Sequence, residues 1–415
     1  MPDNSTRIHH GTPEFRRAML ALFAAGFATF ALLYCVQPLM PVFARDFHVS
    51  AAQSSLSLSL TTGLLAPAMI LAGAISESRG RKPMMVASLF ASSVLTIVCA
   101  VVPHWPTFLA LRALAGITFA GLPAISLAYL SEELDATSVG LGVGLSIGGN
   151  GLGGMCGRLL TGLIADLLSW RYSLGVIGLL GLVATVIFWR TLPPSRNFQP
   201  RPTHFGDLFR TFGEQLRDRR LVPLFAIGFL LMGSFVTSYN YISYRLMDAP
   251  YALSQSAVGL IFTVYLVGIF ASAWIGARAD RVGRGRMLVL MTIVMVAGVA
   301  LTLARPLALV VIGIATLTFG FFGGHSVASS WVGLRAQHAK AQAAALYLFF
   351  YYVGSSVAGS AGGLFWDDAK WLGVAAFVAA LLMLALGAAF VTARQGVPSA
   401  ASAASDVGGT ARPRR

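Results

Sequence analysis

Four ionisable side chains stand within, or at the edge of, long apolar segments, where an ionised group is costly. They are Arg112, Arg158, Asp166 and His325. A charge at the centre of a bilayer costs at least about 2.5 kcal/mol, so such a residue is expected to face a partner or a cavity. The chemistry available to this set is ion pairing by fixed positive charges and proton transfer by a carboxylate or an imidazole.

Arg112, Arg158 and Asp166 each allow more than one interpretation. Arg112 lies about six residues into its apolar segment, and it either faces a cavity or partner or extends toward the interface. Arg158 and Asp166 are eight residues apart, about two helical turns, and therefore lie near one face. Asp166 could carry a proton, or it could form a structural pair with Arg158 or Arg171.

His325 is a further candidate for proton coupling because imidazole titrates near neutral pH. A lone histidine in an apolar segment is also commonly a hydrogen-bonding core residue. The first apolar segment contains no Asp or Glu, so any proton site must lie elsewhere in the chain. We therefore keep Arg112, Asp166, His325 and Arg158 together as proton-coupling candidates.

Amides and tyrosines form a second set, which has the chemistry to contact a solute. Gln37 and Asn240 are 203 residues apart and occupy equivalent positions in an internal repeat described below. Polar aromatic and amide groups within a bilayer should point inward, toward a cavity between helices. Stacking and cation–π contacts there would suit an amphipathic or weakly polar organic solute. The predicted cavity residues are Tyr34, Gln37, Asn240, Tyr241, Tyr244, Tyr347 and Tyr351.

The composition predicts that these residues are positioned by transmembrane helices. The chain is 56% hydrophobic and only 11% charged, against roughly 25% charged residues in a soluble domain. A helix needs about 20 apolar residues to cross a bilayer. Twelve such spans occur, at 18–41, 54–75, 84–102, 106–130, 138–165, 172–191, 221–244, 255–277, 287–304, 306–331, 342–364 and 371–393. We predict an all-α membrane protein with twelve transmembrane helices in two six-helix, pseudo-symmetric bundles.

The basic residues predict how the chain lies in the membrane. With the N-terminus inside, 23 of the 30 Lys and Arg residues fall on the inner side and 5 on the outer side. Both termini are therefore expected in the cytoplasm, in a bacterial inner membrane. The net charge of +14 is explained by the lipid bilayer as partner rather than by nucleic acid.

The predicted organisation has five parts: a cytoplasmic N-terminus at 1–17, a bundle at 18–191, a cytoplasmic central loop at 192–220, a second bundle at 221–393 and a disordered cytoplasmic tail at 394–415. Within the central loop, apolar residues recur at helical spacing and predict an amphipathic helix. This helix either lies on the inner membrane surface or packs on other loops. The apolar residues are Phe205, Leu208, Phe209, Phe212 and Leu216.

One short phrase recurs after 203 residues, each time at the end of an apolar segment. It consists of a glycine, a carboxylate four residues later, a second glycine after three more, and an arginine. A duplicated chain with a charged hinge in each half is typical of membrane transporters. The residues are Gly73, Glu77, Gly80 and Arg81, and Gly276, Asp280, Arg281, Gly283 and Arg284. A carboxylate there could accept hydrogen bonds from a helix N-terminus, or the arginines could simply enforce topology.

Small residues also recur every four positions in two of the spans. Such ladders let helices approach closely and slide, although static packing explains them as well. The predicted packing positions are Gly144, Gly148, Gly149, Gly153, Gly157, Gly354 and Gly359.

These motifs resemble the major facilitator superfamily, over essentially residues 16–393. The repeated phrase resembles the signature loop of that superfamily, although Glu77 and Ser78 depart from its usual Asp and Arg in the first copy. The segment around Arg112 resembles the helix-4 arginine motif, and 144–154 resembles the helix-5 glycine motif of drug/proton antiporters. The segment 34–41 is similar to bacterial efflux members. The resemblance implies that the signature loops latch the halves together and that Arg112 is linked to proton transfer.

We therefore predict a secondary active transporter that works by alternating access, most simply by proton-coupled efflux of a small organic compound. The alternatives are a proton-coupled importer of a sugar or carboxylate, a passive channel and a membrane sensor. No Walker loop or catalytic motif is present, so neither ATP use nor enzyme activity is expected. We expect no cofactor and no metal, a small-molecule substrate and protons as partners, and a monomer.

Overall fold

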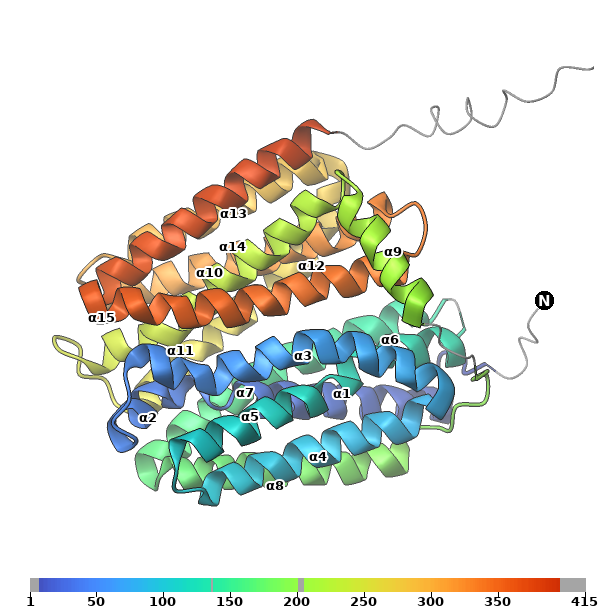
Figure 1. Ribbon diagram of the computed structural model, residues 1–415, viewed down its shortest axis with the longest axis horizontal. Helices are drawn as coiled ribbons and strands as arrows, with labels where there is room; N and C mark the ends of the chain where they lie inside the picture. Colours follow the sequence, from blue (N-terminus) through green and yellow to red (C-terminus); the bar gives the residue numbers. More distant parts are fainter. Residues whose placement is uncertain (1–6, 136, 201–204, 396–415) are drawn as a thin grey trace, which may run out of the picture.

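The computed structural model describes residues 7–135, 137–200 and 205–395, and this part of the chain is helical with no strand. The tail predicted at 394–415 lies almost entirely outside the described residues, as do residues 1–6 of the N-terminus. The helices form two bundles, one from each half of the chain, which lie side by side (Figure 1).

The N-terminal bundle contains six spans. The first is bent, because Pro38 and Pro41 interrupt the helix between α1 and α2. The fourth is divided at Ala120 into α5 and α6. In chain order the elements are α1 (Pro13–Tyr34), η2 (Gln37–Leu39), α2 (Met40–Asp46), α3 (Ala51–Arg79), α4 (Arg81–Val101), α5 (Trp105–Phe119), α6 (Gly121–Glu133), α7 (Val139–Leu167) and α8 (Trp170–Thr191).

The C-terminal bundle also contains six spans. Helix α15 is 55 residues long but has non-helical backbone at Ala369 and Lys370, so it holds two spans. The elements are α9 (Phe205–Arg217), α10 (Val222–Met247), α11 (Gln255–Ile261), η3 (Phe262–Val264), α12 (Tyr265–Val282), α13 (Arg284–Thr302), α14 (Leu307–Arg335) and α15 (Lys340–Arg394). Of these, α9 is too short and too polar to span a membrane.

Ten helical segments are long and apolar enough to cross a membrane by themselves. Two further spans complete the twelve. One is the second half of α15, and the other is α7, whose 29 residues are long enough to cross the bilayer. The predicted fold class is confirmed: an all-α membrane protein with twelve helices in two six-helix bundles.

Two glycines at equivalent places end α3 and α12. Gly80 has φ +93° and Gly283 has φ +98°, a backbone region that strongly favours glycine. Each is followed at once by a new helix, α4 or α13, which begins with an arginine. The two copies of the repeated phrase therefore adopt the same turn.

The start of α1 and the end of α15 lie at one end of the molecule, here called the termini end (right in Figure 1). At the opposite end, here called the far end, lie α2 and α11. Helix α9 lies at the termini end, with Phe212 and Gln215 buried and Phe209 62% exposed. The Gln215 amide donates to the His338 carbonyl, 3.1 Å away, so one edge of α9 packs on the loop between α14 and α15.

Two helix pairs join the bundles. Helix α3 packs beside the first half of α15, and α7 packs beside α11 and the adjoining part of α12. The remaining spans surround these four and pack mostly within their own bundle. The site described next lies where the four interface helices meet the bent first span.

Candidate functional site

The centre of the interface is a hydrogen bond between the two amides that the repeat made equivalent. Gln37 Nε2 donates to Asn240 Oδ1 over 2.7 Å, and both side chains are fully buried. Gln37 stands on η2, where Pro38 interrupts the first span, and Asn240 stands in the far half of α10. The structure therefore brings Gln37 and Asn240 together and makes them a direct link between the bundles.

Arg158 of α7 joins the same cluster, with only 1% of its surface exposed. Its Nε donates to Gln37 Oε1 over 2.6 Å, and its Nη1 donates to the Gly154 carbonyl over 2.6 Å. Three aromatic rings surround the guanidinium: Tyr34 at 4.3 Å, Tyr265 at 4.7 Å and Phe262 at 5.3 Å. No carboxylate pairs with it in the described part of the chain.

Tyr244 of α10 seals the interface toward the far end. Its hydroxyl donates to the Met40 carbonyl over 2.9 Å and lies 2.5 Å from Ser54 Oγ of α3. The Gln255 amide donates to the Pro38 carbonyl from the neighbouring α11. These contacts join the C-terminal bundle to the bend of the first span, and we call them the far-end seal.

Asp166 takes part in the same closure. It stands one residue before the end of α7 and accepts a hydrogen bond from the Ser256 N–H, 3.3 Å away, in the first turn of α11. A carboxylate at a helix N-terminus is favoured by the helix dipole. The structure therefore does not pair Asp166 with Arg158 but uses it to join α7 to α11 across the interface.

The contacts between bundles end near the midpoint of the membrane. On α3 and α15, Ser356 Oγ donates to the Ser59 carbonyl over 2.7 Å, and a Cβ on Gly63 would lie 2.7 Å from Ser356 Oγ. On α7 and α12, a Cβ on Gly151 would lie 3.0 Å from the Ile269 side chain. Gly63 and Gly151 are near the middle of their helices. Beside Gly63, Ser355 Oγ donates to Thr62 Oγ1 over 3.5 Å. Nearer the termini end, the described residues give no hydrogen bond between α3 and α15 or between α7 and α12.

The repeated signature loops lie at the termini end, and each is held within its own bundle. Arg81 pairs with Glu132 at 2.6 Å, whereas Arg284 pairs with Asp280 and donates to Ser330 Oγ over 2.7 Å. The Glu77 carboxylate forms no hydrogen bond or ion pair with another described residue. Gly73 and Gly276 lie inside the last turns of α3 and α12, and Arg281 is exposed.

Arg112 is buried inside the N-terminal bundle, away from the interface. Its Nε donates to the Ser57 carbonyl over 2.9 Å, and its Nη2 donates to the Leu33 carbonyl over 2.9 Å. A longer contact of 3.5 Å joins Nη1 to Leu32 O. The sequence predicted that this buried charge needs a partner, and the structure supplies backbone carbonyls of α1 and α3. All three nitrogens of the guanidinium donate hydrogen bonds to them.

His325 and two predicted cavity tyrosines form a separate cluster in the C-terminal bundle. The imidazole Nδ1 lies 2.9 Å from the Tyr347 hydroxyl, and its ring lies 4.8 Å from the ring of Tyr351. Tyr241 belongs to neither cluster, because its hydroxyl donates to the Gly359 carbonyl over 2.8 Å. Apart from Tyr241, the predicted cavity set therefore divides among the interface centre, the far-end seal and the His325 cluster.

The glycines of α7 have two different environments. Gly149, Gly153 and Gly157 pack on the backbone of α1, and a Cβ on Gly153 would lie 2.0 Å from the Phe27 carbonyl oxygen. At Gly144 and Gly148, by contrast, an added Cβ would have nothing within 4 Å. Gly354 packs on the Phe229 backbone of α10, and Gly359 lies beside the Asn240 amide.

Sequence reasoning missed several contributors to this site. Phe262 and Tyr265 stack on Arg158, Gln255 and Ser54 close the far end, and Ser356 joins α15 to α3. The spacing of Phe262 and Tyr265 indicates one helical face. No local signal indicates that this face meets Arg158, because the pairing is between bundles.

A cavity of about 620 Å³ opens at the far end of the C-terminal bundle. Trp366 lines it, and the same ring lies 5.4 Å from the ring of Tyr244 in the far-end seal. The charged residues that line it are mostly basic. They are Arg245, Arg305 and Lys370, with Asp248 as the one carboxylate.

Comparison with known proteins identifies the family to which this chain belongs. The family model described as "Major Facilitator Superfamily" matches residues 22–249. The chain is 51% identical over 381 residues to an uncharacterized MFS-type transporter, YybF, of Bacillus subtilis (strain 168), covering 92% of this chain and 94% of that protein. It is 47% identical over 379 residues to the inner membrane transport protein YnfM of Escherichia coli (strain K12), covering 91% of each.

A solved structure shares the fold at low sequence identity. It is a bacterial homolog of the human lysosomal transporter Spinster, in an inward-facing and unoccupied conformation. The TM-score is 0.77 at 15% identity, and the match covers 92% of this chain and 98% of that one.

Proposed function

This chain belongs to the major facilitator superfamily, as its resemblance to that superfamily predicted, and we propose that it is a secondary active transporter that exports a small organic compound in exchange for protons. Membership makes it a multi-pass membrane transporter rather than an enzyme. Its direction, its coupling ion and its substrate are the proposed part.

The observation that carries the proposal is the unequal closure of the two bundles. At the far end, Tyr244, Gln255 and Asp166 join the bundles, and at the centre Gln37 bonds to Asn240. Beyond Gly63 and Gly151, the interface helices have no such links among the described residues. Alternating access requires a site at the midplane that is closed on one side and reachable from the other.

The termini end is proposed to be the cytoplasmic side of a bacterial inner membrane. Most Lys and Arg residues lie toward it, which is the expected bias for inner loops. In this orientation the conformation faces inward, and we propose the five-part organisation with the boundaries that the sequence predicts. We propose that one copy of the chain is sufficient, because each half supplies one side of the central site.

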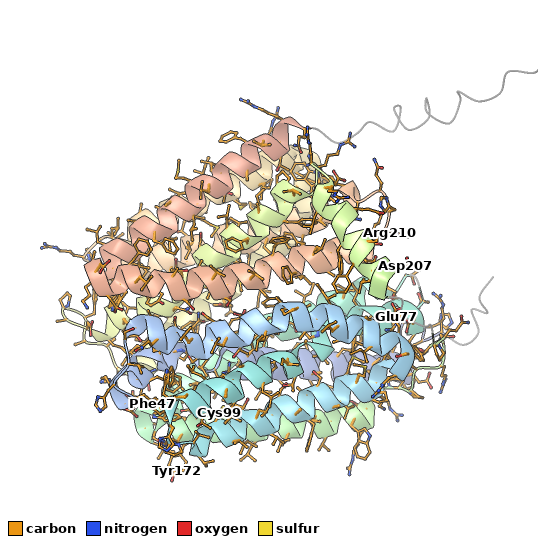
Figure 2. The ribbon with its side chains drawn as sticks, in the orientation of Figure 1. Phe47, Glu77, Cys99, Tyr172, Asp207 and Arg210 are labelled. Atoms are coloured by element: carbon orange, nitrogen blue, oxygen red, sulfur yellow. The ribbon has the colours of Figure 1, made fainter. Side chains whose placement is uncertain are left out.

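The signature loops are the proposed cytoplasmic gate. They are intact turns with partners inside their own bundles, and Glu77 is available for a new contact. Figure 2 shows Glu77 at the termini end of α3, with Asp207 and Arg210 of α9 at the same end of the molecule. Closing this end would bring the loops toward the opposite bundle.

Efflux and proton coupling are supported by the helix-5 glycine motif and by the His325 cluster. His325 can exchange a proton and its Nδ1 is in contact with the Tyr347 hydroxyl, so charging the imidazole would change a buried hydrogen bond. Arg112 is a weaker candidate for direct proton exchange, because a guanidinium stays protonated and its donors are bonded to carbonyls.

The test is compound-induced proton movement in liposomes that hold the purified protein and a trapped pH dye. Wild type is compared with His325→Gln and with Tyr347→Phe, which removes the hydroxyl and leaves the imidazole. We expect a compound to move protons in wild type and not in His325→Gln. Compound uptake with no proton signal in wild type would refute coupling to protons. Equal proton signals in wild type and His325→Gln would exclude His325 as the proton site.

A further inference from the structure

We propose that Arg158 binds a negatively charged group of the transported solute, so that the substrate class is small organic anions that carry a carboxylate or a phosphate. This inference rests on the proposed transport function and assigns its substrate chemistry. It also replaces the weakly polar or cationic solute that aromatic residues alone would suit.

The first argument is an unbalanced charge at the centre of the interface. Arg158 is buried between the bundles, and no described carboxylate pairs with it. The Asp and Glu residues of the described chain stand at helix ends, in loops, on α9 or, for Asp367 and Asp368, beside the kink that separates the two spans of α15. The middle of the membrane therefore supplies no negative charge. Buried charges in membrane proteins are expected to have a partner, and here the missing partner can be supplied by the solute.

The second argument is the geometry of the guanidinium edge that carries Nε and Nη2. Gln37 Oε1 accepts from Nε, whereas Nη2 has no hydrogen-bond partner in the described chain. A carboxylate or phosphate binds this edge with two parallel hydrogen bonds, which are shorter and stronger than a bond to a neutral amide. The Gln37 oxygen therefore occupies one of the two positions that an anionic group would take.

Displacing Gln37 would also affect the link between bundles. The amide that accepts from Arg158 donates to Asn240 through its nitrogen, so both bonds depend on one side-chain orientation. An anion that takes the place of Oε1 frees Gln37 to rotate away from Asn240. Anion binding would then loosen the central link of the far-end closure, which is the coupling that an alternating-access site needs.

Further polar groups are available for the rest of the solute. Ser59 Oγ is buried without a hydrogen-bond partner among the described residues. It lies near the Asn240 amide, because a Cβ on Gly359 would be 3.4 Å from Ser59 Oγ and 3.2 Å from Asn240 Nδ2. Asn240 is linked to Arg158 through Gln37, so this hydroxyl and amide suit a hydroxylated or otherwise polar anion.

The basic cavity at the far end favours the same charge. Arg245, Arg305 and Lys370 line it with one carboxylate, Asp248. Through Trp366 and Tyr244, this cavity borders the far-end seal. An anion that passes the seal would therefore enter a region of positive potential, whereas a cation would be repelled.

The experiment measures the thermal midpoint of the purified full-length protein with a matched set of probes. The anions are benzoate, gluconate, citrate and glycerol 3-phosphate. The comparison probes are benzamide, glucose, glycerol and the lipophilic cation tetraphenylphosphonium. The variants are Arg158→Gln, Arg158→Lys and a control, Arg171→Gln. Arg171 stands in the first turn of α8 and donates to the Ala100 and Val102 carbonyls at the end of α4.

We expect at least one anion to raise the thermal midpoint of wild type in a saturable manner. The matching neutral probe should leave the midpoint unchanged. Arg158→Gln should weaken that affinity by about tenfold or more, because a charge-assisted pair is lost. Arg158→Lys should retain part of it, and Arg171→Gln all of it. A merely structural role of Arg158 would lower the midpoint without changing the affinity for the anion.

Two outcomes would overturn the proposal. One is the absence of stabilisation by any anion in the set, and the other is an anion affinity that survives in a folded Arg158→Gln. Binding in detergent does not depend on transport, so the two proposals fail separately. Anion binding without transport in liposomes would refute the transport proposal alone, whereas transport of only neutral or cationic probes would refute the anion proposal alone.

Discussion

Replacing Gly144 with leucine should hold the transporter open at the termini end. Gly144 precedes Gly151 by seven residues and Gly162 by eighteen, which are close to whole numbers of helical turns, so all three share one face of α7. At Gly151 and Gly162 that face touches the opposite bundle, but at Gly144 nothing lies within 4 Å of a Cβ. The leucine therefore fits the present conformation and meets α12 only when the termini end closes.

The size of the effect follows from the contact already made at the far end. There, a Cβ on Gly162 would lie 2.8 Å from the Gln255 carbonyl oxygen and 3.1 Å from Gly259 Cα. If α12 approaches Gly144 as closely, the added side chain costs the closed state about 1–3 kcal/mol of overpacking. That free energy shifts the equilibrium toward the open state by roughly 5- to 150-fold.

The assay is the distance between spin labels on Ser78 and Ala341, which are exposed at the termini end of α3 and α15. Gly144→Leu should enrich the long distance and slow transport. Gly175→Leu is the matched control, because Gly175 also has open space but lies on α8, outside the interface. A distance distribution that is unchanged, or shifted to the short distance, would refute the reasoning.

Three other changes have defined outcomes. Gly153→Ala places a Cβ 2.0 Å from the Phe27 carbonyl oxygen, so we expect a loss of about 1–3 kcal/mol of stability, measured as a lower thermal midpoint. Gln37→Leu removes the acceptor for a buried guanidinium, and it should destabilise the far-end closure by about 1–3 kcal/mol, seen as a wider label distance at that end. The hydrogen bond from Thr137 holds the pKa of Asp135 well below its ordinary value, so its stabilising effect is present above about pH 4 and is lost as the pH falls further. Asp135→Asn should therefore lower the thermal midpoint at pH 7 and have less effect at pH 3.

The arginines show how far sequence reasoning reached in the site. Arg112 and Arg158 are both single guanidinium groups in apolar helices, and the sequence ranks them by position and resemblance alone. In the structure Arg112 bonds to carbonyls of its own bundle, whereas Arg158 meets rings from both bundles. The difference depends on which helix face meets which neighbour. That is decided by packing between segments more than a hundred residues apart.

The amides were predictable from the sequence, whereas the environments of the α7 glycines were not. The repeat identified Gln37 and Asn240 as equivalent, and equivalent positions near a pseudo-twofold axis meet each other, as their hydrogen bond shows. The two glycine ladders of α7 look alike in sequence. Only the structure shows that one packs on α1, whereas Gly144 and Gly148 lie open on the side where α7 meets the other bundle.

The sequence by itself determined the class, the twelve spans, the duplication and the hinge glycines Gly80 and Gly283. These follow from local rules, because a bilayer demands long apolar helices and a left-handed turn favours glycine. Only the tertiary structure decided where the unpaired charge of Arg158 lies and which end of the interface is closed. A transporter sequence must be compatible with both open and closed arrangements, so the choice between them is a property of the packed bundles.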